Sequence, residues 1–103
     1  MCRIKEKTFN ISELRSTLGV FPTGVAVVTA APEAQRPVGI TINSFQSISL
    51  QPALVGWCID GGAASFQAFA RCSHFSISVL AASQAAIAKR FATLGADKFD
   101  GIP

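Results

Sequence analysis

The sequence predicts a mainly β domain with short helices, built as an antiparallel β-barrel or sheet. Apolar and polar residues alternate with a period of two in residues 38–42 and 75–79, as expected for strands with one buried face. β-Branched residues gather in residues 25–28, and helical spacing is confined to short stretches. Only four strands are apparent, too few to close a barrel, so the predicted barrel is incomplete and its open edges favour a second subunit.

Three short helices are expected. Asn10 and Glu13 form a capping pattern at the start of the first, which ends at Gly19 and carries a stripe of Ile11, Leu14 and Leu18. Ser65 is expected to cap a second helix that ends at Arg71. Ser83 is expected to cap a third, with an inward stripe of Ile87, Phe91 and Leu94.

The predicted strands follow the same order along the chain. Residues 25–45 form a hairpin around the polar turn at 32–37, and its second strand continues until Gln51-Pro52 breaks it. The next strand, "ALVGWCID" at 53–60, is nearly all apolar and is expected to be buried on both faces. "HFSISVL" at 74–80 alternates and gives the fourth strand.

The strand at 38–50 is polar but uncharged, and no charged residue occurs from 37 to 59. In an extended chain one face would be apolar, with Val38, Ile40, Ile42, Ile48 and Leu50. The other face would carry Gly39, Thr41, Asn43, Ser47 and Ser49. Small hydrogen-bonding groups suit a flat ring ligand with many polar edges, and glycine lets a ring approach the backbone. A solvent-facing or subunit-facing strand is the alternative.

Other classes of function find little support. Nine Lys and Arg are scattered, with a net charge of +3, so no nucleic-acid face is predicted. No apolar run reaches the roughly 20 residues of a membrane span, and no secretory signal is apparent. Cys2, Cys58 and Cys72 lack metal-site spacing, which favours reduced thiols, a cytoplasmic protein and no metal.

No catalytic residue is predicted. His74 is expected in a core or capping role, and Asp60 has no carboxylate partner nearby in sequence. The Asp60-Gly61-Gly62 stretch is interpreted as an ordinary turn in preference to a phosphate-holding loop. Cys58 and Trp57 are expected to pack in the core.

Four segments in order resemble the short-chain flavin reductases, the split-barrel reductase components of two-component monooxygenases. They are "LRSTLGVFPTGVAVVTA", "PVGITINSFQSISLQPALVGWCID", "HFSISVLAASQAAIAKRFA" and "DKFDG". The resemblance covers most of the chain. It implies a split β-barrel of the FMN-binding type, incomplete in this chain, with residues 1–103 as one domain that forms the N-terminal portion of the family's domain.

The resemblance also implies a flavin between the second and third strands. Thr41, Ile42, Asn43 and Ser44 match the segment along the isoalloxazine ring and ribityl chain, and Ser47 and Ser49 match positions near the ribityl and phosphate groups. Pro22 and Thr23 match the segment that borders the ring. Ser65 matches the end of a phosphate-holding loop, and Phe91 sits where a helix approaches the cofactor.

The implied activity is hydride transfer from NADH or NADPH to FMN or FAD, with reduced flavin passed to a partner oxygenase. The implied assembly is a homodimer. Two alternatives stay open: a flavin-binding electron carrier without catalysis, and an inactive truncated remnant that forms a structural dimer. Aspartate substitutions at Asn43 and Ser47 would separate a flavin site from a subunit interface.

Two departures from the family pattern stand out. The loop after Asp60 reads Gly61-Gly62-Ala63-Ala64 where the family has serines and an arginine, and the lost charge-assisted contact would cost on the order of 1.5–3 kcal/mol in flavin affinity. The family also continues past the DKFxG motif with further strands, so a C-terminal part is expected to be missing here.

Overall fold

The computed structural model describes residues 8, 10–32, 36–93 and 99. Five strands and four short helical segments follow one another along the chain. They are α1 (Ile11–Leu18), β1 (Ala26–Ala30), β2 (Val38–Ile42), β3 (Gln46–Leu50), β4 (Ala53–Gly56), α2 (Phe66–Arg71), β5 (Ser76–Val79), the 3-10 turn η1 (Ala82–Gln84) and α3 (Ala85–Phe91). The prediction of a mainly β chain with short helices is confirmed.

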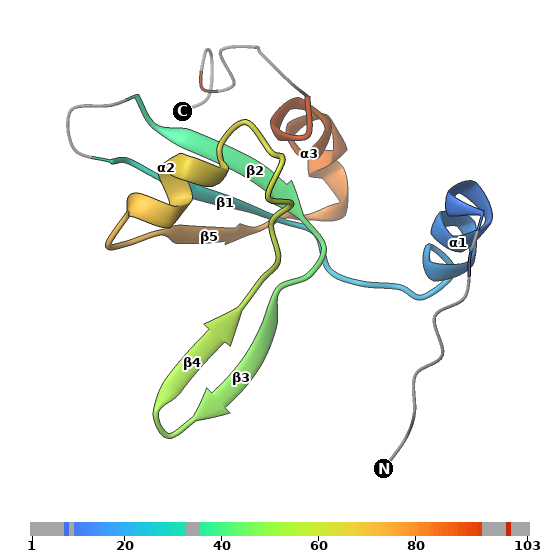
Figure 1. The fold of residues 1–103 in the computed structure, drawn as a ribbon, viewed down its shortest axis with the longest axis horizontal. Helices are drawn as coiled ribbons and strands as arrows, with labels where there is room; N and C mark the ends of the chain where they lie inside the picture. The colour runs from blue at the N-terminus through green and yellow to red at the C-terminus, as the bar shows by residue number, and fades with distance from the viewer. Residues whose placement is uncertain (1–7, 9, 33–35, 94–98, 100–103) are drawn as a thin grey trace.

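The strands form two antiparallel sheets (Figure 1). β1 lies at the centre of the first sheet, in the order β2-β1-β5, and Val28 pairs with Ile40 on one side and with Ile77 on the other. β3 and β4 form a separate two-stranded sheet. The hairpin predicted for residues 25–45 is therefore confirmed as β1–β2.

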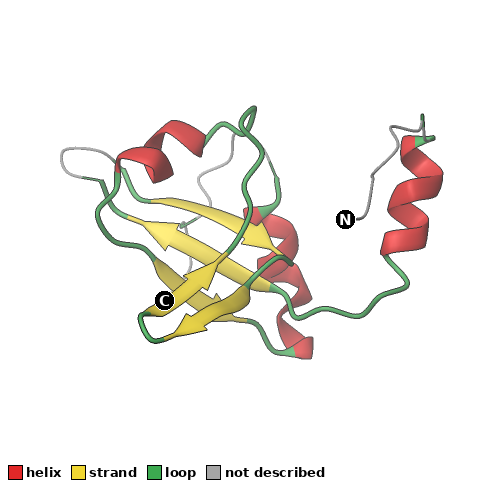
Figure 2. Ribbon diagram, turned by 60° about the horizontal axis from the view of Figure 1, so that its bottom comes forward, coloured by secondary structure: helices red, strands yellow, loops and turns green. Residues whose placement is uncertain are grey.

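Helices cover both faces of the three-stranded sheet. On one face Val28, Ala26 and Ile42 form the buried core, and Phe69 of α2 and Trp57 pack against it. The opposite face includes Gly39, because neighbouring residues of a strand point to opposite sides. The ring of Phe91 from α3 lies against Gly39 on that face. The sheet is thus the middle of three layers (Figure 2).

The strand predicted at 38–50 is two strands, not one. β2 ends at Ile42 and β3 begins at Gln46, so the chain leaves the three-stranded sheet between them. The backbone N–H of Cys58 donates to the hydroxyl oxygen of Ser44 at 2.9 Å. This bond joins the segment that enters the β3–β4 hairpin to the segment that leaves it. Period two could not reveal this break, since both halves are extended.

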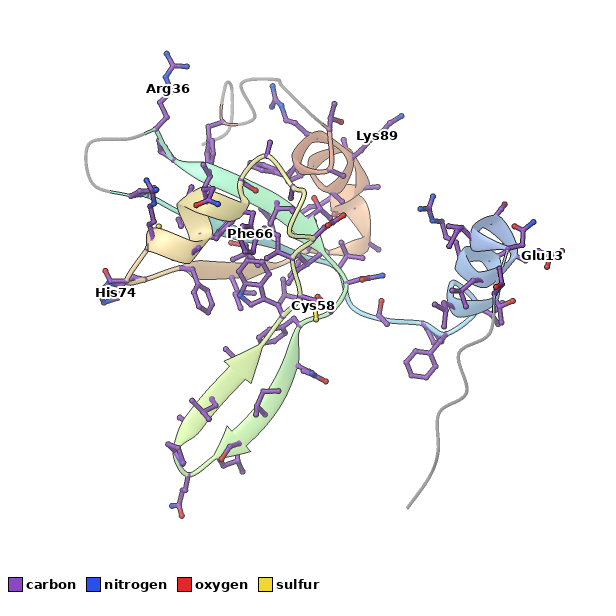
Figure 3. The ribbon with its side chains drawn as sticks, viewed as in Figure 1. Glu13, Arg36, Cys58, Phe66, His74 and Lys89 are labelled. Atoms are coloured by element: carbon purple, nitrogen blue, oxygen red, sulfur yellow. The ribbon has the colours of Figure 1, made fainter. Side chains whose placement is uncertain are left out.

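The prediction that residues 53–60 are buried on both faces is wrong. Leu54 and Val55 are adjacent on β4 and point to opposite faces, yet they are 48% and 49% exposed. The hairpin projects from the rest of the chain, and β4 has only β3 beside it among the described residues (Figure 1). Cys58, expected inside a buried strand, is exposed at the base of the hairpin (Figure 3).

The helix predictions are confirmed in part. Asn10 caps α1, with its Oδ1 accepting from the N–H of Glu13 at 3.2 Å, and α1 ends at Gly19. No residue of α1 is buried, including its apolar stripe. Ser65 is the N-cap residue of α2 but makes no side-chain capping bond.

The third helix does not begin where the sequence predicts. Ser83 lies within the 3-10 turn, and Gln84 is the N-cap residue of α3, so the predicted cap at Ser83 is wrong. The side chain of Gln84 instead accepts from the N–H of Ala81 at 2.8 Å. Phe91 is buried as expected, while Leu94 lies outside the described residues.

None of the helices in the described ranges has the length and apolarity needed to cross a lipid bilayer.

Candidate functional site

Six of the predicted site residues lie on the path from β2 into the hairpin. Thr41 and Ile42 end β2, Asn43 and Ser44 form the connector, and Ser47 and Ser49 lie on β3. Ile42 belongs to the buried core, and Ser44 holds the base of the hairpin. The polar side chains on this path are uncharged amide and hydroxyl groups, as the sequence pattern indicates, and Phe45 and Ile48 are exposed among them.

The small residues of β2 make room for a helix. A Cβ atom at Gly39 would lie 2.6 Å from two ring carbons of Phe91. Two residues on, the hydroxyl of Thr41 donates to the backbone carbonyl of Ala88 in α3. The face that sequence analysis expects to be open to a ring ligand is therefore covered by α3 at both positions.

Substitution of Thr41 tests whether its hydrogen bond to Ala88 holds α3 against the sheet. Thr41→Val removes the hydroxyl and leaves the Ala88 carbonyl without that donor, so we expect the free energy of unfolding to fall by about 0.5–1.5 kcal/mol. Urea denaturation measures the change, and Thr41→Ser should restore most of it. Thr17 is a matched control, since its hydroxyl donates to a carbonyl within exposed α1, and Thr17→Val should change stability by less than about 0.5 kcal/mol. Equal losses in both variants would show that the Thr41 bond does not hold α3 to the sheet.

A groove brings three more predicted residues together. Pro22, Thr23 and Asn43 line one part of a cavity of about 640 Å³. The rest of its lining comes mainly from α1 and the residues that follow it, namely Ile11, Leu14, Arg15, Leu18, Gly19 and Phe21. Sequence analysis identified the stripe of α1 but did not assign it to a site. The signal in the sequence was that this stripe lies only a few residues before Pro22 and Thr23, so that α1 could border the same groove.

The remaining predicted residues lie elsewhere. Phe91 is buried beneath Gly39, and its ring meets that of Phe99 edge to face, with centroids 5.2 Å apart. Ser65 is half-buried at the start of α2. The structure thus unites Pro22, Thr23 and Asn43 in one groove but leaves Ser65 and Phe91 on different elements.

The segment before Ser65 is a turn, as the sequence predicts. The carboxylate of Asp60 accepts from the N–H of Gly62 at 3.0 Å, and the carbonyl of Asp60 accepts from the N–H of Ala63 at 2.9 Å. Two amides that would serve an anion are therefore already bonded, and a negative charge lies beside them. These contacts make the turn a poor cradle for a phosphate group.

His74 is exposed, so the expected core role is wrong, and its Nδ1 lies 2.9 Å from the hydroxyl oxygen of Ser73. A second cavity of about 650 Å³ adjoins His74 and Arg71 and is lined by none of the predicted site residues. Within the described ranges no three His, Cys, Asp or Glu side chains gather as a metal site would require.

The architecture is that of a partial split barrel: a three-stranded antiparallel sheet and a hairpin joined by an uncharged polar connector. The chain belongs to the family described as the flavin reductase like domain, which matches residues 18–103. It is 45% identical over 87 residues to the FMN reductase (NADH) SmoA of Agrobacterium fabrum and 37% identical over 99 residues to the stachydrine N-demethylase reductase subunit Stc3 of Rhizobium meliloti.

Solved structures agree with this assignment. The Streptomyces globisporus NADH:FAD oxidoreductase SgcE6, solved with NAD and FAD fragments, superposes with a TM-score of 0.78 at 43% identity. That comparison covers 86% of this chain and 53% of the other. The match to SmoA likewise covers 84% of this chain and 49% of the relative, and the match to Stc3 covers 96% and 43%. The chain therefore spans about half the length of these relatives.

Proposed function

We propose that residues 1–103 form the N-terminal portion of a flavin reductase domain. In this proposal the protein binds FMN or FAD, reduces it with NADH or NADPH, and supplies reduced flavin to a partner oxygenase. The observation that carries the proposal is the family match across residues 18–103, which includes the whole uncharged path from Thr41 to Ser49. Relatives named as FMN and FAD reductases support both flavins. A relative named as a monooxygenase reductase component supports the partner.

The groove beside Asn43 fits a flavin in size and in chemistry. Its volume of about 640 Å³ lies within the range typical of small-molecule sites. Leu14, Leu18 and Phe21 offer apolar surface to a ring, and Thr23 and Asn43 offer hydrogen-bonding groups to its polar edge. Ser47 and Ser49 would continue these contacts along the ribityl chain.

The phosphate end of the flavin needs a positive charge that the Asp60 turn does not provide. Arg15 is the charged member of the groove lining, on the face of α1 that also carries Leu18. A guanidinium group can bind a phosphate through two parallel hydrogen bonds. We therefore assign the phosphate contact to Arg15.

The protein's contribution to the reaction is binding and orientation. The bound flavin and the nicotinamide supply the redox chemistry, in which a hydride leaves NAD(P)H and the flavin is reduced. Apolar side chains of the groove exclude water from one side of the ring, and Asn43 and Thr23 fix its orientation. This role requires no acid–base pair, and we assign none.

The proposal includes two features beyond the reaction. We place the protein in the cytoplasm, supported by three cysteines whose number and spacing match neither a disulfide framework nor a metal site. We also propose that the protein is a homodimer, supported by the exposed sheet edges and the 15% of charged residues.

The first experiment is a titration of the purified chain with FMN. We expect quenching of FMN fluorescence with a dissociation constant no weaker than tens of micromolar, and oxidation of NADH that depends on added flavin. Bound flavin without accelerated NADH oxidation would indicate an electron carrier instead. The absence of any binding at about 100 μM FMN would overturn the proposal for this chain.

A charge placed at Asn43 tests the position of the site. Asn43→Asp sets a carboxylate beside the proposed ring edge, and Ser47→Asp sets one near the ribityl chain, so each is expected to weaken FMN binding about tenfold or more. Asn10→Asp is the matched control, because aspartate caps a helix as well as asparagine does and Asn10 lies outside the groove lining. Equal affinity in all three variants would move the flavin site away from this path.

A further inference from the structure

The second cavity, of about 650 Å³, lies at the opposite end of the three-stranded sheet from the flavin groove, and we call it the end cavity. β1 runs from Ala26, which pairs with Ile42 beside the groove, to Ala30, which lines the end cavity. Four residues of extended strand, about 13 Å, separate these two ends. No described residue lines both cavities. Figure 3 shows His74, from the end cavity, at the end of the sheet away from α1.

One wall of the end cavity is positively charged. Arg71 ends α2, His74 lies in the connection from α2 to β5, and both line the cavity with exposed side chains. The hydroxyl oxygen of Ser73 lies 2.9 Å from Nδ1 of His74. When Ser73 donates to Nδ1, the ring proton is on Nε2, from which it can be donated to a ligand. Among the described residues no carboxylate lines the cavity or pairs with Arg71, so this wall suits an anionic group.

Two hydroxyl groups lie side by side on the sheet next to this wall. Thr29 of β1 is directly opposite Ser76 of β5, so the two side chains are on the same face, and both line the cavity. A hydroxyl group can donate to an anionic oxygen. The guanidinium group of Arg71 presents a planar fork of N–H donors that matches the two oxygens of a carboxylate. The sheet and α2 together therefore offer donors to a carboxylate from two directions.

The rest of the lining is mainly apolar. It comes from the two ends of the β1–β2 connection, from the start of β5 and from one aromatic ring near the end of the chain, namely Ala30, Ala31, Pro32, Pro37, Phe75 and Phe99. Proline and phenylalanine rings offer rigid, flat surfaces to a ligand. The volume lies within the range typical of small-molecule sites. A bare inorganic anion would use none of this apolar surface, whereas an organic acid would use both kinds of lining.

We propose that the end cavity binds a small organic carboxylate with a flat apolar body, such as an aromatic acid. The carboxylate accepts from the guanidinium group of Arg71, and His74 and the sheet hydroxyls complete its hydrogen bonds. The apolar body packs against the proline and phenylalanine rings of the lining. This site is separate from the flavin groove, and its occupation does not depend on flavin.

A titration followed by the amide signals of the ¹⁵N-labelled chain tests the site directly. Benzoate is the probe, and benzamide is its matched control, because it has the same ring without the charge. We expect benzoate to bind with a dissociation constant of about 1 mM or tighter and to shift the signals of residues 71–76. Benzamide and inorganic phosphate should each bind at least about tenfold more weakly.

Three outcomes of this titration would overturn the proposal. Equal binding of benzamide would remove the role of the positive wall. Equal binding of phosphate would remove the role of the apolar lining. Benzoate shifts confined to residues 11–23 and Asn43, or displacement of bound FMN by benzoate, would place the acid in the flavin groove instead.

The cysteines of the chain provide a second readout. Cys72 lines the end cavity, whereas Cys58 is exposed at the base of the β3–β4 hairpin and lies outside this lining. Iodoacetate is itself a carboxylate, iodoacetamide is its neutral counterpart, and in both reactions the cysteine sulfur displaces iodide. We expect the ratio of the iodoacetate rate to the iodoacetamide rate to be at least about fivefold higher at Cys72 than at Cys58. Mass spectrometry of the labelled peptides measures both rates, and benzoate should slow the labelling of Cys72 alone.

Substitution of Arg71 completes the test. Arg71→Gln should weaken benzoate binding about tenfold and lower the iodoacetate preference at Cys72 by a similar factor, while FMN affinity stays unchanged. Arg36→Gln is the matched control, because it removes the same charge from an exposed side chain that lies outside the lining and points away from the sheet in Figure 3. Its effect should be less than about twofold, since solvent and salt screen a charge at the surface. Equal losses in the two variants would show general attraction of anions and would overturn the proposed site.

Discussion

Replacement of Phe91 by alanine is expected to lower the free energy of unfolding by about 3–5 kcal/mol, the largest effect of any substitution proposed for this chain. The side chain is 3% exposed and fills the space between α3 and β2, where its ring lies against Gly39 and meets Phe99. Alanine would leave a cavity that the sheet backbone cannot fill, because strands move little to close such gaps.

Urea denaturation in the absence of flavin measures this loss, and Phe91→Leu should show a smaller one. Phe75→Ala serves as the comparison, since Phe75 is 46% exposed and packs edge to face against Trp57 on the other side of the sheet. If Phe75→Ala proved as costly as Phe91→Ala, then α3 would not be a principal support of the sheet.

A side chain at Gly39 is expected to produce the second-largest effect. Gly39→Ala would place its Cβ atom 2.6 Å from the ring of Phe91, a distance that requires the ring or the strand to move. Forced overpacking of this kind costs about 1–3 kcal/mol. Thermal unfolding should show a correspondingly lower midpoint, by roughly 4–8 °C for each kcal/mol in a domain of this size.

Gly24→Ala is the matched control, because no atom lies within 4 Å of the Cβ position at Gly24. That variant should leave the midpoint unchanged or slightly raised, since alanine reduces the entropy of the unfolded chain. The combination of Gly39→Ala with Phe91→Leu should recover part of the loss. A Gly39→Ala protein as stable as the parent would contradict the close packing of α3 on β2.

The sequence predicted local structure well where the pattern depends on near neighbours. The cap at Asn10 and the β1–β2 hairpin are both set by residues close together in the chain, and both are present. The cap expected at Ser83 failed for an equally local reason. Gln84 can reach back to the N–H of Ala81, and the resulting 3-10 turn delays the start of α3.

Long-range packing was predicted less well, because periodicity shows that a face is apolar but not what covers it. β4 was expected to be buried, and Leu54 and Val55 are half exposed. The reverse occurred on β2, where Gly39 and Thr41 suggested an open polar face and α3 covers it. The predicted site residues from Thr41 to Ser49 are neighbours along the chain, whereas the groove beside Asn43 also needs α1, which periodicity could not place next to it.

The central position of β1 has a consequence for the order in which the chain folds. Val28 pairs with Ile40 across a short connection and with Ile77 across a much longer one, whereas β3 and β4 pair only with each other. Both hairpins close short loops and can form early, but β5 can join the sheet only after a long loop has closed, at a larger entropic cost. Until that happens one edge of β1 is unpaired. The arrival of β5 is therefore the step that turns two local hairpins into one cooperative unit.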